Sequence, residues 1–161
     1  MNQPPVTGSS AEDMNAAPLR PPPGSAPGTL VPQPHAAHPV ISLYAYGAKE
    51  LVSKTIANVS ELRAEVQRLP VTWVDVSGVG DTQVVSQIAE LFDMHDLALA
   101  DVVHTYQRSK VDEYDDHLFI VIRMVVGGSQ TQTEQLSLFL GSNYVLTFQE
   151  HPGDCFDPIR E

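Results

Sequence analysis

Residues 117–149 read HLFIVIRMVVGGSQTQTEQLSLFLGSNYVLTFQ and contain three apolar runs separated by turn residues. β-Branched and aromatic side chains dominate each run, which favours strands at 117–126, 134–140 and 144–149. Only Arg123 interrupts the first run, so that strand is predicted to be covered on both faces. Gly141-Ser-Asn143 predicts a hairpin between the other two, because glycine and asparagine tolerate positive φ.

The preceding part of the chain alternates strand and helix patterns. Asn58 and Glu61 have the spacing of a capping box, and Asp81 precedes a run with helical periodicity, so both mark helix starts. The expected helices are 58–69, 82–92 and 96–104, and the expected strands are 40–46, 50–56, 71–76 and 110–114. Early alternation followed by paired strands predicts an α/β fold, a mixed β-sheet with helices packed against it.

Residues 1–39 differ in composition from the rest of the chain. They hold 10 of the 13 prolines and no aromatic residue. Such a segment buries too little apolar surface to offset the entropy of ordering, which predicts a disordered, proline-rich tail. The expected folded domain is therefore residues 40–161, long enough to bury a core.

The charge is acidic and limits the possible partners. The formal net charge is −11, of which the tail contributes −1 and residues 40–161 contribute −10. An acidic surface repels phosphate backbones and attracts cations, so no nucleic-acid partner is expected. Cys155 is the only cysteine, which excludes an intrachain disulfide. Because no window reaches the 18 to 20 apolar residues of a membrane span, we expect the chain alone to be soluble.

Signatures of catalysis are weak, so no enzyme is predicted. Serine, histidine and aspartate occur without a Gly-x-Ser-x-Gly elbow or a His-Glu-x-x-His motif. Cys155 follows His151 by four residues, but a packing or surface cysteine fits the segment better than a nucleophile. Gly78-Val-Gly80 is half of a dinucleotide fingerprint whose third glycine position is Gln83. We therefore interpret it as a turn into a helix capped by Asp81.

Two groups of potential metal ligands remain open to a structural interpretation. The first group comprises Asp93, His95, Asp96, Asp101 and His104. Asp101 and His104 are three residues apart, so one helix face could present both, and carboxylates and imidazoles suit divalent ions. Helix capping and loop roles for the aspartates are the alternative. The second group, Asp112, Glu113, Asp115 and Asp116, favours a solvated turn whose charge Lys110 could offset.

Three phrases occur in a fixed order across the second half of the chain. They are WVDVSG (73–78), FDMHDLALADVVHTYQRSKVDEYDDHLFIVIRM (92–124) and TEQLSLFLGSNYVLTFQEHPGDCFDPIRE (133–161). Together they resemble the cytoplasmic amino-terminal domain of the CorA family of magnesium and cobalt channels. Asp101 is followed by Gln107-Arg-Ser-Lys110, which is similar to that family's Gln-Arg-Pro-Lys phrase after an acidic residue. In the resemblance, FDPIRE starts the long stalk helix that leads to the membrane.

The resemblance implies a pentameric transporter of Mg²⁺, and of Co²⁺, with this domain on the cytoplasmic face of the cell membrane. It implies a membrane part in a C-terminal region absent here, and a regulatory divalent ion bound between neighbouring domains, with Asp101 as a ligand. Three residues depart from the family pattern: Ala100, Tyr106 and Ser109 replace an acid, a histidine and a proline. A domain of a ZntB-like zinc transporter and a free-standing interaction domain are the alternatives.

Overall fold

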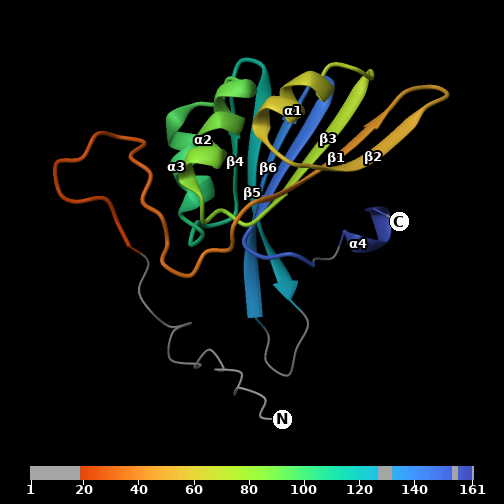
Figure 1. Cartoon of the computed structure of the whole chain (residues 1–161). Helices are drawn as coiled ribbons and strands as arrows, with labels where there is room; N and C mark the ends of the chain where they lie inside the picture. Colours follow the sequence, from red (N-terminus) through yellow and green to blue (C-terminus); the bar gives the residue numbers. More distant parts are fainter. Residues whose placement is uncertain (1–18, 127–131, 154–155, 161) are drawn as a thin grey trace, which may run out of the picture.

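The computed structural model describes residues 19–126, 132–153 and 156–160, which form one seven-stranded sheet with helices against it (Figure 1). The strands are β1 (Val40–Tyr46), β2 (Leu51–Ile56), β3 (Val71–Ser77), β4 (Lys110–Glu113), β5 (His117–Val126), β6 (Gln132–Gly141) and β7 (Tyr144–Gln149). The helices are α1 (Val59–Glu65), α2 (Thr82–Leu91), α3 (Asp96–Val103) and α4 (Asp157–Arg160). The order of the strands in the sheet is β2-β1-β3-β7-β6-β5-β4.

The sheet is mixed, as the sequence predicted. Strands β3 and β7 pair in parallel at its centre, with Thr72 opposite Tyr144 and Ser77 opposite Gln149. The other neighbouring pairs are antiparallel. A parallel pair needs a crossover between its strands, and here α2, α3 and the strands β4 to β6 lie between them in sequence. The prediction of an α/β fold with a mixed sheet is confirmed.

Local signals in the sequence set the helix starts. The Asp81 carboxylate accepts hydrogen bonds from the amides of Gln83 and Val84, so it caps α2. Asn58 Oδ1 accepts from the Glu61 amide at 3.0 Å and caps α1. Helix α1 ends at Glu65 rather than at the predicted residue 69. Pro70 has no amide N–H to donate to the Val66 carbonyl, and the Thr72 hydroxyl donates to that carbonyl instead, at 2.9 Å.

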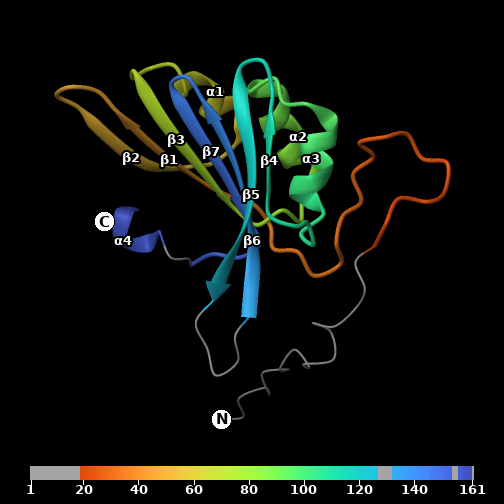
Figure 2. The ribbon, with the colours of Figure 1, turned by 180° about the vertical axis from the view of Figure 1, so that it is seen from behind.

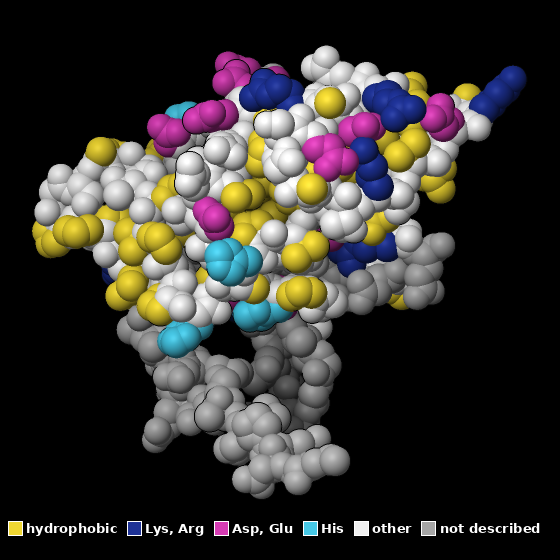
Figure 3. Space-filling view, viewed as in Figure 1, with side chains coloured by type: hydrophobic (Ala, Val, Ile, Leu, Met, Phe, Trp, Pro, Cys, Tyr) yellow, Lys and Arg dark blue, Asp and Glu magenta, His cyan; other side chains and the backbone are white. Residues whose placement is uncertain are grey.

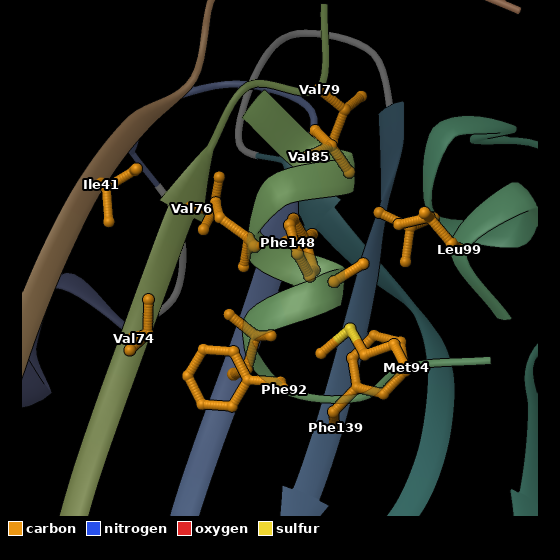
Figure 4. Close-up of a cluster of buried hydrophobic side chains, with 14 of the residues drawn as sticks. Ile41, Val74, Val76, Val79, Val85, Phe92, Met94, Leu99, Phe139 and Phe148 are labelled. Atoms are coloured by element: carbon orange, nitrogen blue, oxygen red, sulfur yellow. The ribbon is translucent and has the colours of Figure 1, made fainter. Parts of the chain in front are cut away.

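Helices α1 to α3 cover one face of the sheet and build the core there (Figure 1). Val74 and Val76 of β3, Phe148 of β7 and Phe139 of β6 point from the sheet toward α2, where Phe92 meets them (Figure 4). Each of these side chains is buried. Burying side chains of this size contributes roughly 1.5 to 3 kcal/mol each, so this layer stabilises the packing of the helices on the sheet.

The opposite face of the sheet is less covered within the described residues. Viewed from behind, it shows the strands in front and α4 beside the lower part of the sheet (Figure 2). Ile122 of β5 lies on this face, opposite to the core residues Phe119 and Val121, and is 37% exposed. The prediction that β5 is covered on both faces is therefore wrong, because α1 to α3 all pack on a single side. An apolar run indicates a strand without showing how many layers cover it.

Residues 19–39 run beside the helices without forming a helix or strand. Leu30 and Ala36 pack against the core, and the Gly80 amide donates to the Ala37 carbonyl at 2.8 Å. A Cβ at Gly80 would collide with the Ala36 carbonyl, so glycine permits this close approach. The predicted tail boundary at residue 39 and its disorder stay predictions, and residues 1–18 lie outside the described ranges.

Candidate functional site

The candidate site begins with α3, the helix that carries Asp101. Its start is capped by His95, whose Nδ1 accepts from the Leu97 amide at 3.2 Å. The apolar side of α3 is buried in the core, through Ala98, Leu99, Val102 and Val103. Asp101 lies off that buried side, and its side chain remains 25% exposed. The helix therefore fixes the Asp101 backbone in the core while its carboxylate reaches solvent.

Lys110 at the start of β4 is the direct partner of Asp101. Its ammonium nitrogen lies 2.7 Å from Asp101 Oδ2 and 2.6 Å from Asp112 Oδ2. Burial lowers the pKa of Lys110, but the hydrogen bonds to the two carboxylates outweigh this effect and raise the pKa above its usual value. The ammonium also lies 5.3 Å from the centre of the Phe119 ring, a cation–π distance. Lys110 is thus a charged bridge between two aspartates.

A buried amide holds the segment that joins α3 to β4. Gln135 of β6 donates from Nε2 to the Asp101 carbonyl at 2.8 Å and accepts from the Gln107 amide at 2.9 Å. Arg123 of β5 donates to the Thr105 carbonyl at 2.8 Å. Because Gln135 is 2% exposed, these bonds form away from competing water. The backbone on either side of the Asp101–Lys110 pair is therefore fixed to the sheet.

A buried carboxyl, Glu134, lies on the less covered side of the sheet near the start of β6. Glu134 is 5% exposed and pairs in register with Met124 of β5. The His151 amide lies 3.4 Å from its Oε1, a long hydrogen bond. Burial raises the pKa of Glu134 above its usual value, and the bonds from His151 and Glu150 reduce the effect.

Helix α4 is joined to the sheet by a buried ion pair. Arg160 Nη2 lies 3.1 Å from Asp75 Oδ2, with side chains 12% and 5% exposed. Thr147 donates its hydroxyl to Asp75 Oδ1 at 2.6 Å and accepts from Trp73 Nε1 at 3.0 Å. The guanidinium lies 5.3 Å from the centre of the Trp73 ring. Four groups from β3, β7 and α4 thus form one polar junction.

Sequence comparison now identifies the family. Residues 70–161 match the family described as "CorA-like Mg2+ transporter protein", which is more than half of the chain. The chain belongs to the CorA family. The matched region contains α2, α3, the strands from β3 onward and α4, and hence both Asp101 and the junction at Arg160. The resemblance stated from the three sequence phrases is confirmed.

Two curated relatives are considerably longer than this CorA-family chain. The cobalt/magnesium transport protein CorA of Thermotoga maritima is 41% identical over 93 residues, covering 56% of this chain and 26% of that protein. A Bacillus subtilis protein named as a metal ion transporter, YfjQ, is 31% identical over 106 residues, covering 66% and 33%. The chain therefore spans about a quarter to a third of the length of these relatives.

Solved structures share the fold. The soluble domain of CorA from Methanocaldococcus jannaschii superposes with a TM-score of 0.53 at 15% identity, covering 74% of this chain and 42% of that chain. The full-length CmaX protein superposes with a TM-score of 0.54 at 14% identity, covering 71% and 36%. No helix in the described ranges of this chain has the length and apolar character needed to cross a bilayer.

The structure separates the first predicted ligand group of this CorA-family domain. Asp93 adopts a positive φ of 52° in the loop after α2, His95 and Asp96 occupy the cap and first turn of α3, and His104 follows its last residue. Asp101 faces Lys110 instead of these residues. Among the described residues, no group of three His, Cys, Asp or Glu could hold a metal ion. The donors that the structure describes in one chain therefore do not fit a resident divalent ion.

The second acidic group is divided between a strand and a turn. Asp112 is paired with Lys110, as the sequence suggested, whereas Asp116 lies 2.6 Å from His117 Nδ1. His117 is buried and stacks on Tyr114, with 5.0 Å between ring centres. Figure 3 shows acidic and basic side chains interspersed along the upper edge of the helix-covered face. Charge on that face is therefore spread between neighbours of opposite sign.

The remaining candidates carry no catalytic arrangement in the described residues. Gly78 has a φ of 99° and turns the chain into the helix capped by Asp81, as predicted. Residues 36–38 pack directly on Gly78 and Gly80, so this loop has no room for a phosphate. Cys155 lies outside the described residues.

Proposed function

We propose that this chain is the cytoplasmic, regulatory domain of a CorA-like transporter that carries Mg²⁺ and Co²⁺. The observation that carries the proposal is the family match over residues 70–161, in a chain whose relatives are named for cobalt, magnesium or metal ion transport. The acidic charge of residues 40–161 agrees with a cation as the physiological signal rather than nucleic acid. No enzymatic activity is assigned.

In this proposal, Asp101 supplies one ligand to a regulatory divalent ion. Its carboxylate is partly exposed on α3, within reach of another molecule. One carboxylate at a wet surface binds Mg²⁺ poorly, because this ion gives up its water reluctantly. A second carboxylate must therefore come from a neighbouring copy, and this requirement favours a homo-oligomer, which we propose to be a pentamer. An ion bound between copies stabilises the assembled ring that it bridges.

The membrane part of the proposed transporter lies in sequence that this chain does not contain. Helix α4 starts at Asp157, and the matched regions cover only 26% and 33% of the two relatives, so most of their length lies outside the match. A reading frame that continues past Glu161 into two apolar segments of about twenty residues is expected, since that length spans a bilayer. A reading frame that closes without such segments contradicts the proposal.

The functional test compares Asp101→Ala with Asp115→Ala in the longer transporter. Asp115 is an exposed acid in the β4–β5 turn, so its removal changes the net charge equally without touching α3. Asp101→Ala should weaken inhibition by internal Mg²⁺, because it removes a contact that only the closed assembly makes. The measurement is Mg²⁺ current against internal Mg²⁺ concentration. Superimposable inhibition curves for Asp101→Ala and the unmodified protein would refute the role of Asp101.

A further inference from the structure

The Lys110 ammonium occupies the place that a small cation would take between two carboxylates. It lies 2.7 Å from Asp101 Oδ2 and 2.6 Å from Asp112 Oδ2, so these oxygens are no more than about 5.3 Å apart. The three side chains are 33%, 25% and 41% exposed for Lys110, Asp101 and Asp112. Two carboxylates this close repel each other unless a cation lies between them. In this chain that cation is the ammonium group of Lys110, which is covalently part of the protein.

We propose that Lys110 is a built-in competitor for divalent cations at Asp101 and thereby sets the ion concentration to which this domain responds. The inference rests on the proposed role of Asp101 and adds the regulation of that site. A divalent ion that binds Asp101 must displace the ammonium, which then moves toward Asp112 or solvent. Lys110 thus keeps a single domain unresponsive and leaves binding to an assembly that supplies more ligands.

The surrounding contacts make Lys110 an effective competitor. Gln135 fixes the Asp101 carbonyl, and Lys110 begins β4, whose backbone pairs with Val121 of β5. Both ends of the ion pair are therefore attached to the same sheet. A tethered group acts at an effective concentration in the millimolar range or above, which matches or exceeds that of a free ion. Lys110 also remains available to compete at any ion concentration, since it is part of the chain and cannot diffuse away.

A second lysine in the same chain provides a matched control. Lys54 lies 3.1 Å from Glu61 and 2.9 Å from Glu65, and its side chain is 32% exposed. It has the same chemistry as Lys110, a lysine between two carboxylates at similar exposure. Lys54→Met therefore removes an equivalent bridge far from Asp101 in sequence. Comparing the two variants shows whether ion binding increases specifically at Asp101 or wherever a lysine is removed from between two carboxylates.

The experiment titrates the 161-residue chain with MgCl₂ at fixed KCl and follows the amide resonances of Asp101 and Asp112. CoCl₂ is the second probe, because its paramagnetism broadens nearby resonances and so locates the ion. Lys110→Met should lower the Mg²⁺ concentration at half-response of these amides on the order of tenfold, because binding then breaks neither ion pair, and each such pair changes an equilibrium a few-fold. Lys54→Met should leave both resonances as in the unmodified chain.

Equal responses of Asp101 in the unmodified chain and in Lys110→Met would overturn the competitor role while leaving Asp101 available as a ligand. No response at Asp101 in either protein would also overturn it, and the currents of Asp101→Ala then decide the proposed function separately. If Co²⁺ broadened the resonances around Asp101 equally in Lys54→Met and Lys110→Met, the effect would depend on net charge alone, and Lys110 would have no special role. Should Lys110→Met lose its folded amide dispersion, Lys110→Gln replaces it in the same titration.

Discussion

Replacing Arg160 by methionine tests how strongly α4 is held to the sheet. The guanidinium pairs with Asp75 at 3.1 Å and lies over Trp73, and both members of the pair are largely buried. Methionine keeps much of the side-chain volume and the contact with the ring. It removes the charge that neutralises Asp75, while the hydrogen bond from the Thr147 hydroxyl to Asp75 stays. The substitution therefore tests how much the charge of Arg160 contributes to the stability of the junction.

The expected loss of stability is about 2 kcal/mol. A hydrogen bond to a charged group contributes about 1.5 to 3 kcal/mol, and a cation–π contact about 0.5 to 1 kcal/mol. Leaving a charge buried without its partner costs about 3 to 5 kcal/mol in a rigid site. Helix α4 has four residues, so it can lift away and let water reach Asp75, which reduces that cost. For this reason we expect a loss of stability smaller than the roughly 3 to 5 kcal/mol of a rigid site.

Urea unfolding of the 161-residue chain measures the loss, and Trp73 reports it locally. Trp73 is the only tryptophan, so its fluorescence follows the junction directly. The double variant Asp75→Asn/Arg160→Met removes both charges and should recover most of the loss, giving a coupling energy of about 2 kcal/mol in the double-mutant cycle. A change in the urea midpoint at a constant slope identifies a change in stability alone.

Two outcomes would refute the reasoning about the junction. One is a stability of Arg160→Met within about 0.5 kcal/mol of the unmodified chain, which is the usual range for surface substitutions. The other is a double variant whose loss of stability equals the sum of the losses of the two single variants, since additive losses indicate that the two residues do not interact. Either result would mean that α4 is not held by Asp75 in solution.

Two further substitutions test buried features away from Asp101. Burial raises the pKa of Glu134 above its usual 4.5, so the folded state favours the protonated form and this advantage is lost as pH rises through the folded pKa. Glu134→Gln should therefore raise the free energy of unfolding by about 1 kcal/mol at pH 7. The accompanying gain in urea midpoint should disappear near pH 4.5, where the carboxyl of the unmodified chain becomes protonated. A gain that does not change with pH would contradict this prediction. Gly80→Ala should displace residues 36–38 and cost about 1 to 3 kcal/mol, with faster exchange of the residue-80 amide; a neutral effect would mean that these residues are not packed in solution.

Features that depend on neighbouring residues could be predicted from the sequence. Asp81 and Asn58 were identified as caps, because a cap involves amides two or three residues away. The strands β1, β5 and β7 begin and end where the apolar runs do. Their pairing order was not predicted, since the parallel contact between β3 and β7 joins residues about seventy positions apart. Side-chain periodicity contains no information about such partners.

The sequence did not predict the contacts around the candidate site, because these contacts also join residues that are far apart in the chain. Gln135 fixes the Asp101 carbonyl from 34 positions away, and nothing in its local sequence marks it. The sequence marked His95 as a potential metal ligand, whereas in the structure its imidazole caps α3 by accepting from the Leu97 amide. The signal that could have found Lys110 was its place in the Gln-Arg-Ser-Lys phrase after Asp101. The sequence predicted only that Lys110 offsets the acidic run, in which Asp112 is one of its two partners.

The two lysine bridges show why an acidic residue in a cation-transport family is not by itself an ion site. Lys54 and Lys110 each lie between two carboxylates, and both are about one-third exposed. They differ in what holds the acids, because Glu61 and Glu65 lie on α1, whereas Asp101 and Asp112 are joined across a helix and a strand. Both bridges connect a strand to a helix, because Lys54 lies on β2 and Lys110 lies on β4. In our proposal a divalent ion binds only at the second bridge, where displacement of Lys110 would break one contact between α3 and β4 while the buried side of α3 and the bond from Gln135 to the Asp101 carbonyl keep the helix in place.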